Sequence, residues 1–182
     1  MLSLIHTIVG TSRRFAMASL AALSCVAGLG VARDAAAEPV IVAAAIPYDE
    51  NADIQDKVRL ECTELNAQLS AFIQEFARAK GVEITAGDAT ANTGRVLRVA
   101  ITNAISQGNA FLGHAKSSSA RGTLYDNGTA VASFRATRNS MGGMFAGYKG
   151  SCSVLGRTVR AMGEDIGTWL ANPVDGANLG DR

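Results

Sequence analysis

The chain has 182 residues, of which 48% are hydrophobic and 18% charged, and its formal net charge is +1. This composition excludes a disordered tail protein, which combines low hydrophobicity with high net charge. It also argues against a nucleic-acid partner, because there is no strong positive charge to neutralise phosphates. The length suits one domain.

The first 37 residues have the pattern of an export signal. Arginines at 13–14 precede an uncharged apolar stretch over residues 15–32, and the alanines at 35–37 fit cleavage by signal peptidase after Ala37. The apolar stretch is long enough to span a bilayer, but the alanines that follow it favour cleavage. We therefore expect a mature chain of 145 residues, 38–182, in the bacterial periplasm.

Two other interpretations of this segment stay open. Residues 20–25, Leu-Ala-Ala-Leu-Ser-Cys, loosely resemble a lipobox, in which Cys25 would be acylated and become the first mature residue of an outer-membrane lipoprotein. The residues after Cys25 are apolar, whereas a lipoprotein tether is usually polar. The arginine pair also fits twin-arginine export, although Ala16-Met17 is weak where two strong hydrophobes are expected. An ordinary secretory signal is favoured.

The start of the mature chain predicts a strand, a loop and a helix. Residues 39–46 form a short apolar run typical of a buried strand, and residues 47–56 are polar and predict a loop. Residues 58–61 fit a short strand or the start of a helix. A helix is predicted over residues 64–80, with Thr63 as its N-cap. Its apolar face, at helical spacing, consists of Leu65, Leu69, Phe72, Phe76 and Ala79.

The middle of the chain predicts strands. Residues 82–84 form a short candidate, and residues 95–106 a longer one, for which a helix is the alternative. Asp126-Asn127-Gly128 indicates a hairpin between strands at 120–125 and 129–137, because Asn and Gly tolerate positive φ. Alternation in the outgoing strand puts Ala130, Ala132, Phe134 and Ala136 on one face, and Val131, Ser133, Arg135 and Thr137 on the other.

The last part predicts a loop, a helix and a tail. Residues 142–150 are rich in glycine, and Ser151 can cap a helix over residues 153–171. Residues 173–182 are polar and predict a flexible tail. The apolar face of the helix consists of Leu155, Val159, Met162, Ile166 and Trp169. This order of elements predicts an α+β fold over residues 38–172: a mostly antiparallel sheet with two amphipathic helices packed on one face.

Cys62 and Cys152 are the cysteines that remain after cleavage at Ala37. An even pair in an exported chain predicts a disulfide. A redox-active pair is the functional alternative, and two unpaired buried thiols are another. A structural bridge is favoured because the C-x-x-C spacing is missing.

Other candidate chemistry is incomplete. The loop from Gly142 to Ser151 differs from a phosphate-binding loop because Lys149 comes one place late. It could still form a generic anion site at a helix N-terminus, with a plain connection as the favoured alternative. His114 is the single histidine of the mature chain and cannot build a histidine-rich zinc site. A hydrolase that combines His114, Ser117 and this loop stays an alternative, although no G-x-S-x-G motif is present.

Glu164 and Asp165 are neighbours that do not face each other on a helix, so we expect both on its solvated side. With no complete constellation, we expect no enzyme activity, no cofactor and no metal.

Charge is distributed unevenly along the mature chain. Residues 38–90 carry −6, residues 91–163 carry +8 and residues 164–182 carry −3. A basic sheet face could meet an anionic partner such as lipid headgroups, polysaccharide or an acidic protein. Internal pairing with the acidic segment is the alternative. The candidate anion- or partner-binding residues are Arg121, Arg135, Arg138, Lys149 and Ser151.

Several segments carry a family likeness: ARGTLYDNG at 120–128, ASFRATR at 132–138, Gly142-Gly143, and YKGSC at 148–152. Over residues 38–172 the chain resembles bacterial exported proteins and lipoproteins with a DUF4410-type domain. The resemblance implies an envelope domain without assigned activity and transfers no functional residue. We therefore expect an exported periplasmic binding or envelope-accessory domain, in contact with a membrane only if Cys25 is acylated.

Overall fold

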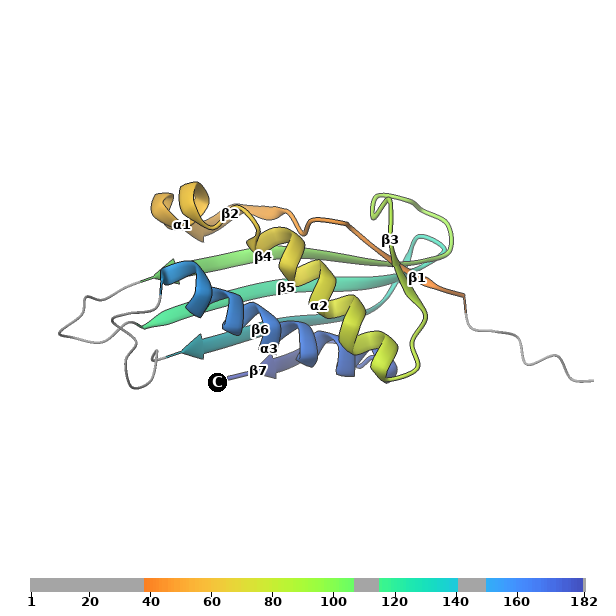
Figure 1. Cartoon of the computed structure of the whole chain (residues 1–182). Coiled ribbons are helices and arrows are strands. Elements are labelled where there is room, and N and C mark those ends of the chain that lie inside the picture. Colours follow the sequence, from red (N-terminus) through yellow and green to blue (C-terminus); the bar gives the residue numbers. More distant parts are fainter. Residues whose placement is uncertain (1–37, 107–114, 141–149, 182) are drawn as a thin grey trace, which may run out of the picture. The chain divides into compact units, whose positions relative to one another are not determined.

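The computed structural model describes residues 38–106, 115–140 and 150–181, which form a sheet with helices packed against it (Figure 1). The strand order is β3-β1-β4-β5-β6-β7, and β2 also pairs with β4. In chain order the elements are β1 (Val40–Val42), β2 (Tyr48–Ile54), α1 (Asp56–Glu61), α2 (Leu65–Ala79), β3 (Ile84–Ala86), β4 (Arg95–Ser106), β5 (Lys116–Asp126), β6 (Thr129–Ser140), α3 (Ser151–Ala171) and β7 (Ala177–Gly180).

The expected α+β class is confirmed, but the sheet is mixed rather than mostly antiparallel. β4, β5 and β6 are antiparallel, whereas β1 runs parallel to β3 and β4, β2 parallel to β4, and β7 parallel to β6. Parallel neighbours need a long crossover connection, usually a helix. Here α2 lies in the connection from β1 to β3, and α3 in the connection from β6 to β7.

Helices α2 and α3 lie together on one face of the sheet, as predicted (Figure 1). The predicted apolar face of α3 is confirmed. The ring of Trp169 meets the ring of Phe134 edge-on at 4.9 Å between centroids, which joins the helix to β6. The five predicted residues of α3 are all buried: Leu155, Val159, Met162, Ile166 and Trp169.

The predicted face of α2 is partly wrong. Leu65 and Leu69 are buried, but Ile73 and Ala77 complete the buried stripe instead of Ala79, which is exposed. The helix begins at Leu65 with Glu64 at the N-cap position, so Thr63 is not the cap.

The two phenylalanines that the sequence assigned to the core side are half-buried instead. Phe72 and Phe76 lie beside α3, where the guanidinium carbon of Arg160 stands 5.1 Å and 5.0 Å from their ring centroids. The shift arises because two overlapping stripes of this helix satisfy helical spacing, and the position of α3 selects between them.

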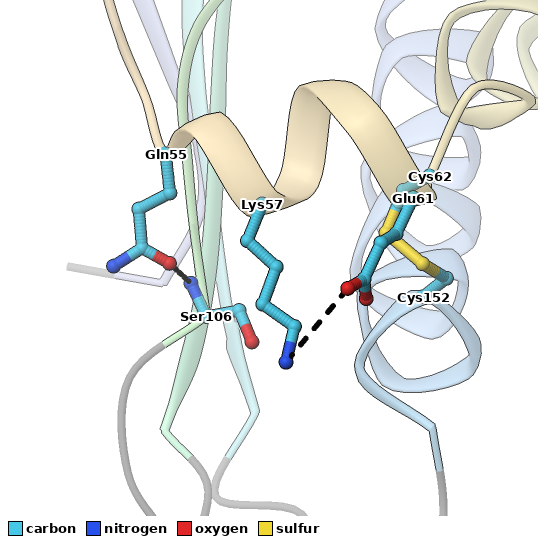
Figure 2. The surroundings of a disulfide bond; sticks show 6 residues. All are labelled: Gln55, Lys57, Glu61, Cys62, Ser106 and Cys152. Carbon is cyan, nitrogen blue, oxygen red and sulfur yellow. Dashed lines mark hydrogen bonds and ion pairs between the residues drawn. A yellow bond between two sulfur atoms is a disulfide. The ribbon is translucent and has the colours of Figure 1, made fainter.

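Two segments predicted to be irregular are strands. The polar stretch 47–56 contains β2, whose pattern shows no clean alternation because it lies on an edge of the sheet and buries only Ile54. The Ser106 N–H at the end of β4 donates to Gln55 Oε1 at 2.8 Å, which connects the end of β4 to the residue that follows β2 (Figure 2). Helix α1 follows directly, which settles the alternative at residues 58–61. The apolar run 39–46 is a shorter strand, β1, than predicted.

The predicted flexible tail contains β7, an ordered edge strand. The Asn139 N–H donates to Asp181 Oδ2 at 2.7 Å, and Arg138 donates to Asp181 Oδ1 at 3.1 Å. The Arg138 guanidinium also makes two hydrogen bonds with Asp165, at 2.7 and 2.6 Å. The Asn139 N–H, supported by Arg138, lowers the pKa of Asp181. The glycine-rich composition of this segment did not indicate a strand, but the contacts of Asp181 with Arg138 and Asn139 hold β7 against β6.

The central hairpin follows the sequence closely. β4 has the predicted bounds 95–106. Asn127 and Gly128 both adopt positive φ, 47° and 79°, as a two-residue turn requires. Among the described residues, no helix is long and apolar enough to span a membrane.

Lys116, the first residue of β5, is 2% exposed, and its side chain makes no ion pair or hydrogen bond with another described residue. Burial, supported by the charge of Lys57, lowers its pKa. We expect Lys116→Met to raise the free energy of unfolding at pH 7 by about 1 kcal/mol, because the variant removes the cost of partly burying a charged ammonium group.

The gain should shrink as the pH rises toward about 10.4, the value of an unfolded lysine. Burial destabilises only the charged ammonium of Lys116. Because the pKa of Lys116 is lower in the folded chain than in the unfolded chain, the folded chain loses this proton at a lower pH, and the cost of burial then disappears. Urea unfolding at pH 7 and pH 10 measures both values. A less stable variant at pH 7 would contradict the prediction.

Candidate functional site

Cys62 and Cys152 form the predicted disulfide, with 2.01 Å between the sulfur atoms and 5.2 Å between the Cα atoms (Figure 2). The bridge joins the end of α1 to the first turn of α3. Nearby, the Lys57 ammonium and the Glu61 carboxylate form an exposed ion pair at 4.0 Å. The bridge closes a separation of 90 residues and connects two packed elements, which is the arrangement of a structural disulfide.

The sheet face turned away from α2 and α3 carries arginine side chains. Side chains alternate between the two faces of a strand. Because Leu97, Ala120 and Phe134 belong to the core, Arg98, Arg121 and Arg135 stand on the opposite face.

The register aligns these residues in two rows across the strands. Arg121 of β5 lies opposite Ala100 of β4 and Arg135 of β6, and Asn178 of β7 lies next to Arg135. The adjacent row consists of Arg98, Thr123 and Ser133. A hollow of about 550 Å³ lies over the two rows and has no carboxylate in its lining; we call it the arginine hollow. Its polar lining residues are Arg98, Arg121, Thr123, Tyr125, Ser133, Arg135 and Asn178.

Arg98 has a structural task at one end of the arginine hollow. Its guanidinium lies 4.4 Å from the centroid of Tyr125. It donates to the carbonyl oxygens of residues 89, 90 and 91 at 2.9–3.1 Å, and to Asn92 Oδ1 at 3.0 Å. Its Nε and Nη2 donors are therefore occupied in holding residues 89–92 against the sheet.

Arg121 and Arg135 keep donors available. Arg121 forms an ion pair with Asp49 of β2, yet its side chain remains 64% exposed. Arg135 is exposed, and no carboxylate pairs with it among the described residues. Like charges directly opposite each other on neighbouring strands destabilise a sheet. An anion that contacts both guanidinium groups would remove this repulsion and gain charge-assisted hydrogen bonds.

Of the four predicted partner-binding residues that the structure describes, it brings together two, Arg121 and Arg135. Arg138 stands apart, bound by Asp165 and Asp181. Asp165 was expected on the solvated side of α3, but its side chain is 17% exposed and paired. Ser151 is not the cap that the sequence predicted: α3 begins at Ser151, two residues earlier than expected, with Gly150 at the N-cap position.

Several predicted residues cannot be placed. Lys149, His114 and the segment 141–149 lie outside the described residues, so the structure does not test an anion site or a hydrolase centre there. Ser117 lies in β5 opposite Asn139. Within the described ranges, no group of three His, Cys, Asp or Glu residues could hold a metal ion.

The sequence missed three features of this face. Asp49 was assigned to a loop and Asn178 to a tail, and Tyr125 had no assigned role. The alternation of β4 and β5 is a signal that could have placed Arg98 and Tyr125 on the outer face.

No protein-family model and no curated protein matches this chain. Among solved structures, a variant of the PelC dodecamer from Paraburkholderia phytofirmans is similar at 16% identity, covering 71% of this chain and 89% of that chain, with a TM-score of 0.46. A minor lipoprotein from Acinetobacter baumannii is similar at 12% identity, covering 74% of this chain and 92% of that chain, with a TM-score of 0.43. At these values the function is inferred from the residues of this chain alone.

Proposed function

We propose that this chain is an exported envelope domain that binds an anionic partner in the arginine hollow and catalyses no reaction. The carrying observation is the pair of Arg121 and Arg135, directly opposite on a sheet face that no described helix covers. Export is supported by the signal pattern of residues 1–37 and by the Cys62–Cys152 bridge, since disulfides persist in oxidising compartments. The resemblance to DUF4410-type exported proteins points the same way.

The chemistry of the arginine hollow favours an anion over a neutral or cationic ligand. Guanidinium groups carry donors only and match carboxylate and phosphate oxygens in a fork. Two carboxylates contact residues of the arginine hollow: Asp49 pairs with Arg121, and Asp175 accepts a hydrogen bond from Ser133. The positive charge of residues 91–163 is therefore only partly neutralised by the acidic residues of 38–90. Arg135 remains available to contact an anionic ligand.

Binding to a dextran sulfate column tests this proposal. We expect Arg135→Gln to elute at clearly lower salt than the unaltered protein at pH 7, because one uncompensated contact with the anion is lost. Arg157→Gln is the matched control, since it removes the same charge from an exposed position on α3. If both variants shift equally, retention reflects net charge and the arginine hollow is not a binding site.

The mass of the exported protein tests how it is held in the envelope. We expect a chain that begins at Glu38, as cleavage after Ala37 produces. A chain that begins at Cys25 and carries acyl groups would replace the periplasmic assignment with an outer-membrane lipoprotein. Intact-protein mass spectrometry distinguishes the two, and the binding prediction applies in either case.

A further inference from the structure

We infer that the partner is a carboxylated polysaccharide whose chain crosses the strands along Arg121, Arg135 and Asn178. This inference rests on the proposed function, namely that the arginine hollow binds anions. It adds the class of ligand and its direction on the sheet.

The free polar groups of the arginine hollow determine which chemical groups a ligand needs in order to bind there. Arg121 keeps open donors beside its pair with Asp49, and Arg135 keeps all of its donors. Thr123 and Asn178 add a hydroxyl and an amide that make no hydrogen bond with other described residues. A ligand therefore needs carboxylate oxygens for the guanidinium groups and hydroxyl groups beside them. A sugar acid carries both on each ring.

Ser133 does not take part in this recognition. Its hydroxyl donates to Asp175 at 2.6 Å and accepts from the Gly176 N–H at 3.2 Å, so it fixes the segment before β7. The free groups are therefore concentrated in the row of Arg121, Arg135 and Asn178, with Thr123 beside it.

An acidic peptide suits the arginine hollow less well. At Arg121 and Arg135 the backbone is paired on both sides, since β5 lies between β4 and β6, and β6 pairs with β7 over residues 134–137. Adjacent strands lie about 4.8 Å apart, whereas side chains on one face of an extended peptide recur at about 6.6–6.8 Å. A sugar chain needs no backbone pairing, because its carboxylates and ring hydroxyl groups can be met by side chains alone.

A lipid headgroup suits it less well too. Acyl chains need a contiguous apolar surface, but apart from Ala100 the side chains of the two rows end in guanidinium, hydroxyl and amide groups. The volume of the arginine hollow, about 550 Å³, is within the usual range for a ligand site. Its open form suits a polymer chain that extends beyond it on both sides.

Calorimetric titration with oligogalacturonate tests the inference, using the exported protein. The comparison ligands are oligoglutamate and polyphosphate of equal charge, phosphatidylglycerol vesicles, and neutral dextran. We expect oligogalacturonate to bind at least tenfold more tightly than each of them. Arg135→Gln should weaken that binding about 10–100-fold, the range for a lost charge-assisted hydrogen bond. Arg135→Lys should recover only part, since the fork is missing.

Asn178→Ala separates the ligand classes. It should weaken oligogalacturonate severalfold and leave polyphosphate unchanged, because only the sugar offers hydroxyl groups to the amide. Arg157→Gln should leave every affinity unchanged. Equal binding of oligoglutamate, polyphosphate or vesicles would overturn the polysaccharide assignment and keep anion binding. An unchanged affinity for every anion in Arg135→Gln would overturn the site itself, and with it the proposed function.

Discussion

Replacing Cys62 and Cys152 together by serine should lower the free energy of unfolding by up to about 4–5 kcal/mol. The bridge restricts a loop of 90 residues in the unfolded chain, and the chain-entropy model assigns a cost of this size to such a loop. This is a large share of the roughly 5–15 kcal/mol that stabilises a typical domain. Urea unfolding, followed by circular dichroism, measures the difference.

Reduction supplies the matched experiment for this prediction. Unaltered protein in dithiothreitol should unfold at the same urea concentration as the double serine variant, because both lack the cross-link. Thiol titration under denaturing, non-reducing conditions should find no free thiol in the mature chain. Two free thiols, or a double variant as stable as the oxidised protein, would show that the bridge contributes nothing.

Replacing Gly163 and Gly167 of α3 together by alanine should lower the free energy of unfolding by about 3 kcal/mol or more. A Cβ at position 163 would lie 2.5 Å from Phe72 Cβ, and one at position 167 would lie 2.7 Å from the backbone nitrogen of Ala77. These neighbours belong to the backbone of α2 or sit next to it, so the helices must separate. Overpacking of this kind typically costs about 1–3 kcal/mol per site.

Gly156→Ala is the control within the same helix. Its added Cβ would lie 3.4 Å from Gln68 Oε1, the end of a flexible side chain that can move. The alanine should then stabilise α3 by about 1 kcal/mol through helix propensity. Thermal unfolding of the two variants and the unaltered protein should separate them in sign. A double variant that gains stability like Gly156→Ala would disprove the close approach of α2 and α3.

The sequence alone determined the elements whose signal is local. The face of α3 follows from the helical spacing of five apolar residues, all of them buried, and Asn127-Gly128 specifies its turn through backbone conformation. The strand at 95–106 was predicted with the bounds that the structure shows, with a helix as the alternative. The disulfide followed from counting cysteines in an exported chain. Each of these properties depends on neighbours in the chain or on composition, so no tertiary contact was needed to predict it.

The edge strands β2 and β7 could not be predicted from the sequence. β2 and β7 pair on one side only and bury few side chains, so neither shows a strong alternation. Both are set by partners distant in sequence, such as Asp181 with Arg138 and Asn139. The parallel pairings and the choice of stripe on α2 depend in the same way on where the crossover helices pack.

The arginine hollow shows most clearly what tertiary structure decided. A two-residue turn after Asp126 would place Arg121 opposite Phe134 if pairing continued without interruption. The register shifts by one residue after Tyr125, so that Leu124 pairs with Ala132 and Arg121 with Arg135. Such a bulge leaves one residue unpaired and bends the strand.

Burial is the physical reason for that shift. Phe134 belongs with Trp169 in the core, and Arg121 must remain on the solvent face, so a bulge reconciles the local turn with the packing of α3. The sequence determined that this chain carries a hairpin with arginines on its outer face. Only the packing of α3 on the opposite face decided that two of those arginines stand side by side.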